Sequence, residues 1–286
     1  MKPDEVEKVG VVGCGLMGSG ISEVVARTGI GVAFVEVSDD AVASGWKRIE
    51  ASTGKAVERG KMSAEDQRAL IGRVSGGTDI RSLADVDLVI EAATEDQETK
   101  IRLFQLLDEI AAPDVVLATN TSSIPIAELA VATNRPDKVI GTHFFNPPPI
   151  MKLVEVVRGL PTSDETVEFA RGFGERIGKT VVLSKDRAGF IVNWLLMPYL
   201  NSAVRMLEEG FATREDIDQA VVLGLAHPMG PLQLLDLIGL DTALYISNVL
   251  FDEFKDPLYA PPTLVKRMVT AGYLGRKTGK GFYDYD

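Results

Sequence analysis

Short apolar runs and amphipathic stretches alternate over the first two thirds of the chain. Seven apolar runs have the length of a β-strand: residues 9–12, 31–37, 88–92, 115–118, 139–141, 153–157 and 180–183. Between them, apolar positions recur at helical spacing over residues 19–28, 41–59, 99–111, 126–132 and 164–177. The motif Ser63-Ala-Glu-Asp66 is a capping box that begins another short helix. Strands that alternate with helices predict an α/β fold with a doubly wound, mostly parallel sheet.

The pattern changes after residue 186, where the alternating strands end. Residues 190–209 form a long apolar helical segment, and Pro198 inside it predicts a kink. Thr213-Arg-Glu-Asp216 is a second capping box, and helical patterns follow over residues 232–254 and 263–272. The length of 286 residues also fits two domains. We therefore predict a first domain over residues 1–186 and a smaller, all-α domain over residues 187–286.

A glycine-rich turn follows the first apolar run. Residues 9 to 18 read Val-Gly-Val-Val-Gly-Cys-Gly-Leu-Met-Gly, in which Gly13, Gly15 and Gly18 form a G-x-G-x-x-G motif. Such a turn lets the backbone approach a pyrophosphate at the positive N-terminal end of the next helix. Glu36 lies at the end of the second run, where a carboxylate accepts hydrogen bonds from an adenosine ribose. Together these features predict a Rossmann-type dinucleotide site; the alternative is a tight turn whose glycines only permit packing.

The charge balance argues against some partners. The formal net charge is −11, which disfavours nucleic acid and anionic membrane surfaces but not a small anion held by local Lys or Arg. The single cysteine, Cys14, excludes an intramolecular disulfide, and we interpret it as a small apolar filler rather than a reactive thiol. The short charged start of the chain has no signal-peptide pattern, and no run of 18 apolar residues follows. We expect a cytoplasmic protein without a metal site.

One of the two histidines lies where open α/β sheets bind ligands. His143 stands in Gly-Thr-His-Phe-Phe-Asn-Pro, just after an apolar strand, and Glu155 follows inside Leu-Val-Glu-Val-Val. A carboxylate in such a run is costly unless it is paired. A His143–Glu155 pair would fix the imidazole tautomer and raise its basicity; alternatively the two side chains never meet. His227 precedes a proline at a helix end, which favours a structural role.

Two further polar groups have both a structural and a functional interpretation. Asn120-Thr-Ser-Ser123 follows the fourth strand, where its side chains would reach cofactor and substrate or simply cap a helix. Asn193 lies in an otherwise apolar helical stretch, so its amide either bridges structural elements or contacts substrate.

These motifs, in this order, resemble the short-chain L-3-hydroxyacyl-CoA dehydrogenases, above all the bacterial 3-hydroxybutyryl-CoA dehydrogenases. The resemblance runs essentially from end to end. Besides the glycine turn it rests on Leu-Val-Ile-Glu-Ala, Asn-Thr-Ser-Ser-Ile, His-Phe-Phe-Asn-Pro, Met-Lys-Leu-Val-Glu-Val-Val, Gly-Phe-Ile-Val-Asn, His-Pro-Met-Gly-Pro and Gly-Arg-Lys-Thr-Gly-Lys-Gly-Phe-Tyr.

The resemblance implies NAD-dependent interconversion of a short (3S)-3-hydroxyacyl-CoA, with 3-hydroxybutyryl-CoA as the best candidate, and the 3-oxoacyl-CoA. His143 would be the general base, with Glu155 as its partner. Ser122 would hydrogen-bond the 3-oxygen, and Asn193 would hold the substrate and the developing oxyanion. A homodimer through the helical domain is also implied, and the apolar residues 195–200 fit it.

The resemblance also implies a set of binding residues. Those for NAD are Gly13, Cys14, Gly15, Leu16, Met17, Gly18, Glu36, Glu95, Lys100, Ser122, Asn146 and Lys277. Lys277 would require the C-terminal tail to fold back over the cofactor. Many relatives carry Asp where this chain has Glu36, and either acid disfavours the 2′-phosphate of NADP.

The coenzyme A portion would contact Ser52. Some relatives place a lysine where this chain has Arg59, which binds phosphate with a different geometry, and Lys55 is a nearby substitute.

The same machinery would also serve 3-hydroxyadipyl-CoA or a hydroxyacyl group on a carrier protein. A non-catalytic role, as in the crystallin relatives, is the third alternative; His143, Glu155, Ser122 and Asn193 argue against it. We expect the helical domain to close over the sheet domain about a hinge near residues 185–188.

Overall fold

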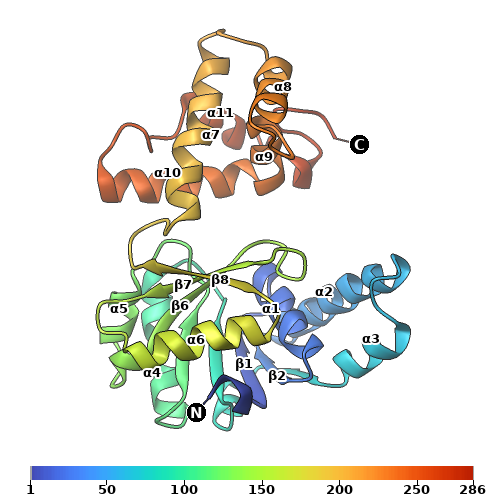
Figure 1. The fold of residues 1–286 in the computed structure, drawn as a ribbon, viewed down its shortest axis with the longest axis vertical. Helices are drawn as coiled ribbons and strands as arrows, with labels where there is room; N and C mark the ends of the chain where they lie inside the picture. The colour runs from blue at the N-terminus through green and yellow to red at the C-terminus, as the bar shows by residue number, and fades with distance from the viewer. Residues whose placement is uncertain (1, 286) are drawn as a thin grey trace. The chain divides into compact units, whose positions relative to one another are not determined.

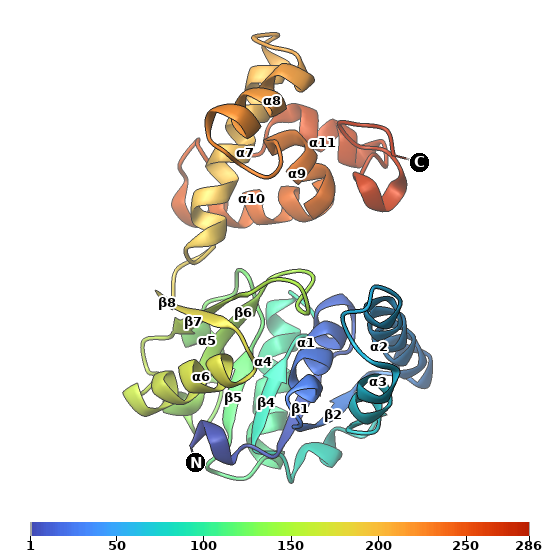
Figure 2. The ribbon, with the colours of Figure 1, turned by 45° about the vertical axis from the view of Figure 1, so that its right-hand side comes forward.

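The structure is a computed structural model that describes residues 2–285. The chain divides into two compact units, one ending at Asp186 and the other beginning at Arg187, and each is described by itself (Figure 1). The first contains a β-sheet with helices on both faces, and the second is built of helices (Figure 2). The predicted fold class, a Rossmann-type sheet followed by an all-α domain, is confirmed.

The sheet of the first unit has eight strands in the order β3-β2-β1-β4-β5-β6-β7-β8. The strands are β1 (Lys8–Val12), β2 (Gly31–Val35), β3 (Val74–Gly77), β4 (Leu88–Glu91), β5 (Val116–Thr119), β6 (Val139–Phe144), β7 (Leu153–Arg158) and β8 (Thr180–Lys185). Neighbouring strands are parallel except β6 and β7, which are antiparallel. The carboxyl ends of β1, β2, β4, β5 and β6 therefore share one edge of the sheet.

Six α-helices surround this sheet. They are α1 (Leu16–Arg27), α2 (Asp39–Glu58), α3 (Ala64–Ile71), α4 (Gln97–Ile110), α5 (Ile126–Val131) and α6 (Asp164–Arg176). Helices α1 and α6 bury apolar side chains such as Ile21, Val25 and Phe173 in one core with Val11, Ile90 and other strand residues. The backbone of β6 lies close to α5, since a Cβ built on Gly141 would come within 2.9 Å of Ile126. Ser63 is the N-cap of α3, as predicted: its hydroxyl accepts a hydrogen bond from the Asp66 backbone N–H and donates one to the Asp66 carboxylate.

The second unit is helical. Its helices are α7 (Val192–Glu208), α8 (Arg214–Gly224), α9 (Pro231–Ile238), α10 (Leu240–Phe254) and α11 (Thr263–Thr270). They share a core that includes Leu200, Leu232, Leu250 and Val265. The buried carboxylate of Asp236 connects the C-terminal segment to this core, because it accepts hydrogen bonds from the backbone N–H groups of Phe282 and Tyr283. Thr213 caps α8, as its motif predicts.

Two elements differ from the sequence prediction. Strand β3 was not predicted, because Val-Ser-Gly-Gly contains one apolar residue and carries no strand signal of its own. The single helix predicted over residues 232–254 is wrong: Gly239 separates α9 from α10, and the two axes meet at 97°. Gly239 has φ +98°, a conformation that residues with a Cβ rarely adopt, so the helix cannot pass through it.

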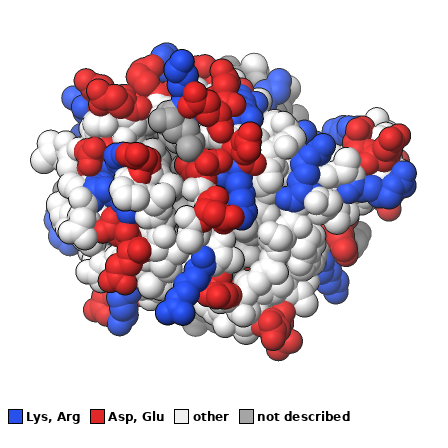
Figure 3. Space-filling view, turned by 90° about the horizontal axis from the view of Figure 1, so that it is seen from below, with Lys and Arg blue, Asp and Glu red and all other residues white. Residues whose placement is uncertain are grey.

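The described surface carries both signs of charge. Figure 3 shows one face of the molecule, on which Lys and Arg side chains are intermixed with Asp and Glu. Some of them form exposed ion pairs, such as Lys8 with Asp85 and Lys138 with Asp114. Within residues 2–285, no single helix is long and apolar enough to cross a membrane; only the bent pair α9–α10 reaches that length and composition when its members are joined.

Candidate active site

The glycine turn after β1 is shaped by close backbone packing. Gly13 has φ +85°, and a Cβ on it would lie 2.5 Å from Cα of Ala93. A Cβ on Gly18 would lie 1.8 Å from the Gly13 carbonyl oxygen. Around Gly15, by contrast, a Cβ would meet no atom of the described residues within 4 Å. Gly13 and Gly18 therefore serve the fold, and Gly15 keeps space open at the start of α1.

This turn fits the pyrophosphate of a dinucleotide. Gly15 is the N-cap of α1 and has no side chain with which to satisfy the first backbone N–H groups of the helix, which are suited to an anion. Leu16 and Met17, which follow in the first turn, are exposed and partly buried respectively. Glu36 follows β2 on the same edge of the sheet, and its Oε1 accepts a hydrogen bond of 2.6 Å from the Cys14 backbone N–H.

Cys14 is fully buried, and a Cβ on Gly45 of α2 would lie 2.8 Å from its Sγ. Burial, together with the charge of Glu36, raises the pKa of the thiol to about 12. The residue thus packs the turn against α2, in agreement with its interpretation as an apolar filler.

The predicted pairing of His143 with Glu155 is confirmed. The two residues stand directly opposite each other in the antiparallel pair β6–β7, with Nδ1 of the imidazole 2.7 Å from Oε2 of the carboxylate. His143 is 6% exposed and Glu155 is 0% exposed, so the interaction is shielded from water. The ring of Phe145 lies beside the imidazole, with 4.6 Å between centroids. An ionised carboxylate only accepts hydrogen bonds, so Nδ1 is the donor opposite it, and the neutral tautomer with this donor has its lone pair on Nε2.

Ser122 lies in the loop after β5 and is bound to Glu95 of the loop after β4. Its backbone N–H and its hydroxyl both donate to Glu95 Oε1, at 2.8 and 3.1 Å. The hydroxyl of Thr121 donates to the other oxygen of Glu95 at 2.7 Å. Asn120, in the same loop, accepts a hydrogen bond from the backbone N–H of Phe144, the residue after His143. Hydrogen bonds thus connect the loop after β5 both to the loop between β4 and α4 and to β6.

Lys100, a cofactor contact implied by the family resemblance, is a buried residue of the first unit. It projects from α4, is 1% exposed, and forms a buried ion pair with Glu91 at the end of β4. Glu91 also accepts a hydrogen bond from the Thr119 hydroxyl at 2.8 Å.

Asn146, predicted as another cofactor contact, is exposed in the loop after β6. In that loop Pro148 packs on α1, since a Cβ on Gly20 would come within 2.7 Å of its ring.

The three residues expected to contact coenzyme A follow α2 to its end. Ser52 and Lys55 lie in the helix and Arg59 is its C-cap, and spacings of three and four residues place them on one face. Ser52 is partly buried, whereas Lys55 and Arg59 are exposed.

Two predicted residues belong to the second unit. Asn193 is buried in the first turn of α7. Lys277 forms an ion pair of 2.6 Å with Asp241, at the start of α10.

Glu91 and Thr119 were not singled out from the sequence. Glu91 ends the apolar strand 88–91, and a carboxylate in such a run signals a buried partner, as it did for Glu155. Which partner it finds depends on the packing of α4 against the sheet, which the sequence pattern does not give.

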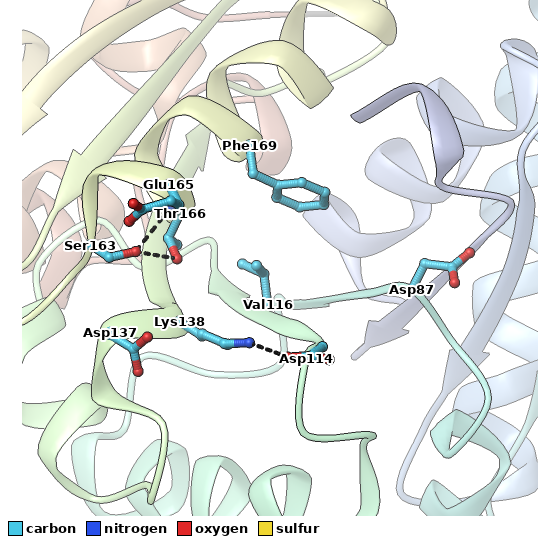
Figure 4. Close-up of a pocket in the computed structure, with 9 residues that line it drawn as sticks. All are labelled: Asp87, Asp114, Val116, Asp137, Lys138, Ser163, Glu165, Thr166 and Phe169. Atoms are coloured by element: carbon cyan, nitrogen blue, oxygen red, sulfur yellow. Dashed lines mark hydrogen bonds and ion pairs between the residues drawn. The ribbon is translucent and has the colours of Figure 1, made fainter. Parts of the chain in front are cut away.

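A separate pocket of about 290 Å³ lies at the amino ends of the strands, at the opposite edge of the sheet (Figure 4). Asp87 precedes β4, Asp114 and Val116 lie at the start of β5, and Lys138 precedes β6. The dashed line between Lys138 and Asp114 in Figure 4 marks their ion pair of 2.6 Å. This pocket is therefore distinct from the candidate site.

The fold and the site together define a class of enzyme. A Rossmann-type sheet carries a glycine turn that fits a dinucleotide. A buried His–Glu pair joins β6 to β7, and the carboxyl end of β6 lies at the same edge of the sheet as the glycine turn. This combination is that of a dinucleotide-dependent oxidoreductase.

Comparison with known proteins gives the family. Residues 8–187 match the NAD-binding domain of 3-hydroxyacyl-CoA dehydrogenase, and residues 189–285 match its C-terminal domain. The chain belongs to the 3-hydroxyacyl-CoA dehydrogenase family, is an enzyme of that kind, and uses NAD as its cofactor.

Several relatives are similar over their whole length. A 3-hydroxybutyryl-CoA dehydrogenase of Mycobacterium tuberculosis is 50% identical, and the alignment covers 99% of each chain. The human mitochondrial hydroxyacyl-coenzyme A dehydrogenase is 43% identical over 98% of this chain and 91% of its own. The crystal structure of M. tuberculosis FadB2 matches with a TM-score of 0.97 at 50% identity, covering 98% of this chain and 99% of that one. That of the (S)-3-hydroxybutyryl-CoA dehydrogenase PaaH1 from Ralstonia eutropha matches with a TM-score of 0.93 at 44% identity, covering 99% and 100%.

Proposed function

We propose that the enzyme interconverts a short (3S)-3-hydroxyacyl-CoA, 3-hydroxybutyryl-CoA before others, and the corresponding 3-oxoacyl-CoA, with His143 as the general base. The observation that carries this proposal is the buried contact of 2.7 Å between His143 Nδ1 and Glu155. The names of relatives that align over nearly the whole chain support the substrate class.

The proton step follows from the geometry of the pair. Because Nδ1 donates to Glu155, Nε2 is the nitrogen that accepts the proton of the 3-hydroxyl group. The imidazolium that results is stabilised by the carboxylate, which stays ionised and holds the ring in one orientation. Bound NAD supplies the acceptor for the hydride that leaves C3. In the reverse direction His143 returns the proton to the 3-oxygen.

Ser122 and Asn193 orient the reacting oxygen in this proposal. The Ser122 hydroxyl is a donor, now directed to Glu95 at 3.1 Å, and it would turn to the 3-oxygen when substrate binds. Asn193 supplies an amide donor from the buried first turn of α7. Together they would favour the developing oxyanion over the neutral ground state.

The cofactor would lie along the glycine turn. The backbone at Gly13, Gly15 and Gly18 would hold the pyrophosphate, and Glu36 would accept from the adenosine ribose hydroxyls. The negative charge of Glu36 repels a 2′-phosphate, which favours NAD over NADP. The nicotinamide end or its ribose would be lined by Glu95, Lys100, Ser122, Asn146 and Lys277. The coenzyme A portion would contact Ser52, Lys55 and Arg59.

The test is the oxidation of NADH followed at 340 nm. We expect fast turnover with acetoacetyl-CoA, slower turnover when NADPH replaces NADH, and none with free acetoacetate. The C6 dicarboxylic 3-oxoadipyl-CoA and a carrier-protein thioester are the competing substrates. A higher kcat/KM with either of these would overturn the substrate assignment, and NADH binding without turnover of any thioester would overturn the catalytic one.

We also propose that the enzyme forms a homodimer through its helical unit. The support is the exposure of large apolar side chains on that unit, among them Leu195 at 60% and Leu237 at 50%. Light scattering coupled to size exclusion should give twice the chain mass of 30.9 kDa. Replacement of Leu195 by Glu should shift this mass toward the monomer, and a monomeric wild-type protein would contradict the assignment.

A further inference from the structure

Three polar side chains meet in the interior, directly beneath the loops of the candidate site. Glu91 ends β4, Thr119 ends β5, and Lys100 projects from the first turns of α4. All three are at most 1% exposed. The Lys100 ammonium group is ion-paired with Glu91 Oε2, and the Thr119 hydroxyl donates to the same oxygen at 2.8 Å.

A buried ion pair alone does not explain this cluster. Apolar side chains of similar size fill such a space at least as favourably, since desolvation of two charges offsets their attraction. What apolar side chains cannot do is accept hydrogen bonds from the backbone. Glu91 Oε1 accepts from the backbone N–H of Ala93 at 2.8 Å, and the Thr119 hydroxyl accepts from that of Thr121 at 3.2 Å. The cluster thus fixes the first residues of two loops at once.

Those two loops carry groups of the proposed site. The loop after β4 carries Glu95, and the loop after β5 carries Ser122. They are joined again further out, because Thr121 Oγ1 and Ser122 both donate to Glu95. A continuous series of hydrogen bonds therefore begins at Glu91 and ends at the backbone N–H of Ser122, with Thr119, Thr121 and Glu95 as its intermediate members.

We propose that Glu91, Lys100 and Thr119 are positioning residues that set the place of the Ser122 hydroxyl toward the reacting 3-oxygen; this rests on the proposed role of Ser122. The atoms of the cluster are hydrogen-bonded to one another and to the backbone. Loss of the cluster moves Ser122, and a misplacement of about 1 Å lowers the rate on the order of 10²-fold.

Thr119→Val tests the proposal in the full-length enzyme, because valine keeps the shape of threonine and removes the three hydrogen bonds of the hydroxyl, which join it to Glu91, Lys100 and the backbone N–H of Thr121. We expect kcat with acetoacetyl-CoA to fall about tenfold or more, while the Kd of NADH, measured by fluorescence, changes less than about threefold. Dividing the rate by the concentration of NADH-binding sites removes any unfolded fraction from the comparison. Thr119→Ser retains the hydroxyl and should restore the rate.

Thr162→Val is the matched control. Thr162 is equally buried in the first unit, and its hydroxyl donates to a backbone carbonyl, that of Val139, at 2.7 Å. Val139 is the first residue of β6, at the opposite edge of the sheet from the site. We expect its kcat to equal that of the wild type. Equal kcat values for Thr119→Val and Thr162→Val would overturn the proposal.

A double-mutant cycle with Ser122→Ala separates this inference from the proposed function. If the cluster acts through Ser122, Thr119→Val lowers kcat in the wild-type background and has no further effect on Ser122→Ala. Multiplicative losses would show that Thr119 acts independently and would overturn the inference. An unchanged kcat for Ser122→Ala itself would instead overturn the proposed role of Ser122.

Discussion

At the scale of single residues, two buried carboxylates organise the site. Each lies in an apolar strand, where it is stable only when a partner side chain forms an ion pair or hydrogen bond with it. Glu155 and Glu91 each stand in a run of buried apolar residues, and each takes part in buried hydrogen bonds, with His143 in one case and with Lys100 and Thr119 in the other. A charge in such a place is costly unless it is paired. The pairing therefore fixes the geometry of its partner as well as its own.

Replacement of Glu155 by Gln tests the partnership at β6 and β7. The amide has nearly the same shape but no charge, so it no longer stabilises the imidazolium that forms on His143. We expect kcat to fall about tenfold or more and its pH dependence to change, while NADH binding is retained. A pH–rate profile that superimposes on that of the wild type would show that the pair has no part in proton transfer.

Cys14 should be inert in the folded protein. Burial raises the pKa of its thiol to about 12, so at pH 8 the group is neutral, and only the thiolate is nucleophilic. We expect no reaction with a thiol reagent in native buffer and one equivalent of reaction per chain in denaturant, followed by mass spectrometry. Rapid labelling of the native enzyme at pH 8 would contradict the buried placement.

At the scale of elements, glycines define two junctions for different reasons. Gly15 leaves open space at the start of α1, whereas Gly239 permits the sharp joint between α9 and α10. A methyl group at the first position would enter the space proposed for the pyrophosphate, and at the second it would strain the backbone.

Gly15→Ala is therefore expected to fold with an unchanged Tm and to bind NADH more weakly. Its matched counterpart is Gly18→Ala, whose Cβ would overlap the Gly13 carbonyl oxygen and should lower Tm as well as binding. Thermal unfolding and fluorescence titration of both variants check this. Normal NADH affinity in Gly15→Ala would argue that the open space is not where the cofactor lies.

Gly239→Ala should destabilise the second unit, because φ +98° is unfavourable for any residue with a Cβ. The expected loss in the free energy of unfolding is about 1–2 kcal/mol. Gly224, the last residue of α8 with no positive φ and open surroundings, is the control, and its replacement by Ala should be neutral or stabilising. Urea unfolding measures both changes, and equal stabilities would refute the argument.

At the scale of the whole molecule, the two units meet in the chain at Asp186 and Arg187, and each of these residues contacts other residues of its own unit. Asp186 accepts hydrogen bonds from the backbone N–H groups of Ile126 and Ala127 at the start of α5. The guanidinium group of Arg187 lies 4.7 Å from the ring centroid of Phe254, within the second unit. The predicted hinge near residues 185–188 includes both of these residues.

Small-angle scattering tests the predicted closure about this hinge. We expect the radius of gyration to fall when NAD and acetoacetyl-CoA bind together, because closure would exclude water from the reacting groups. Either ligand alone should produce a smaller change. A radius of gyration that stays constant with both ligands present would count against closure.

Most of this arrangement could be predicted from the sequence, because the structure of most segments follows from residues within the segment itself. The glycine turn, seven of the eight strands and the capping boxes at Ser63 and Thr213 carry their own signals. Strand β3 has none, because its pairing with β2 decides its structure, and the break at Gly239 was hidden within a continuous apolar pattern. The cluster of Glu91, Lys100 and Thr119 depends on three elements meeting, which periodicity along one chain does not reveal.

The most direct test of the central claim is the turnover of His143→Ala, measured with NADH and acetoacetyl-CoA beside an NADH fluorescence titration of the same preparation. If His143 is the general base, kcat falls by about 10² to 10⁴ while the Kd of NADH stays near its wild-type value. A variant that binds NADH and turns over at the wild-type rate would show that the proton is moved by another group, and the account of this site would be wrong.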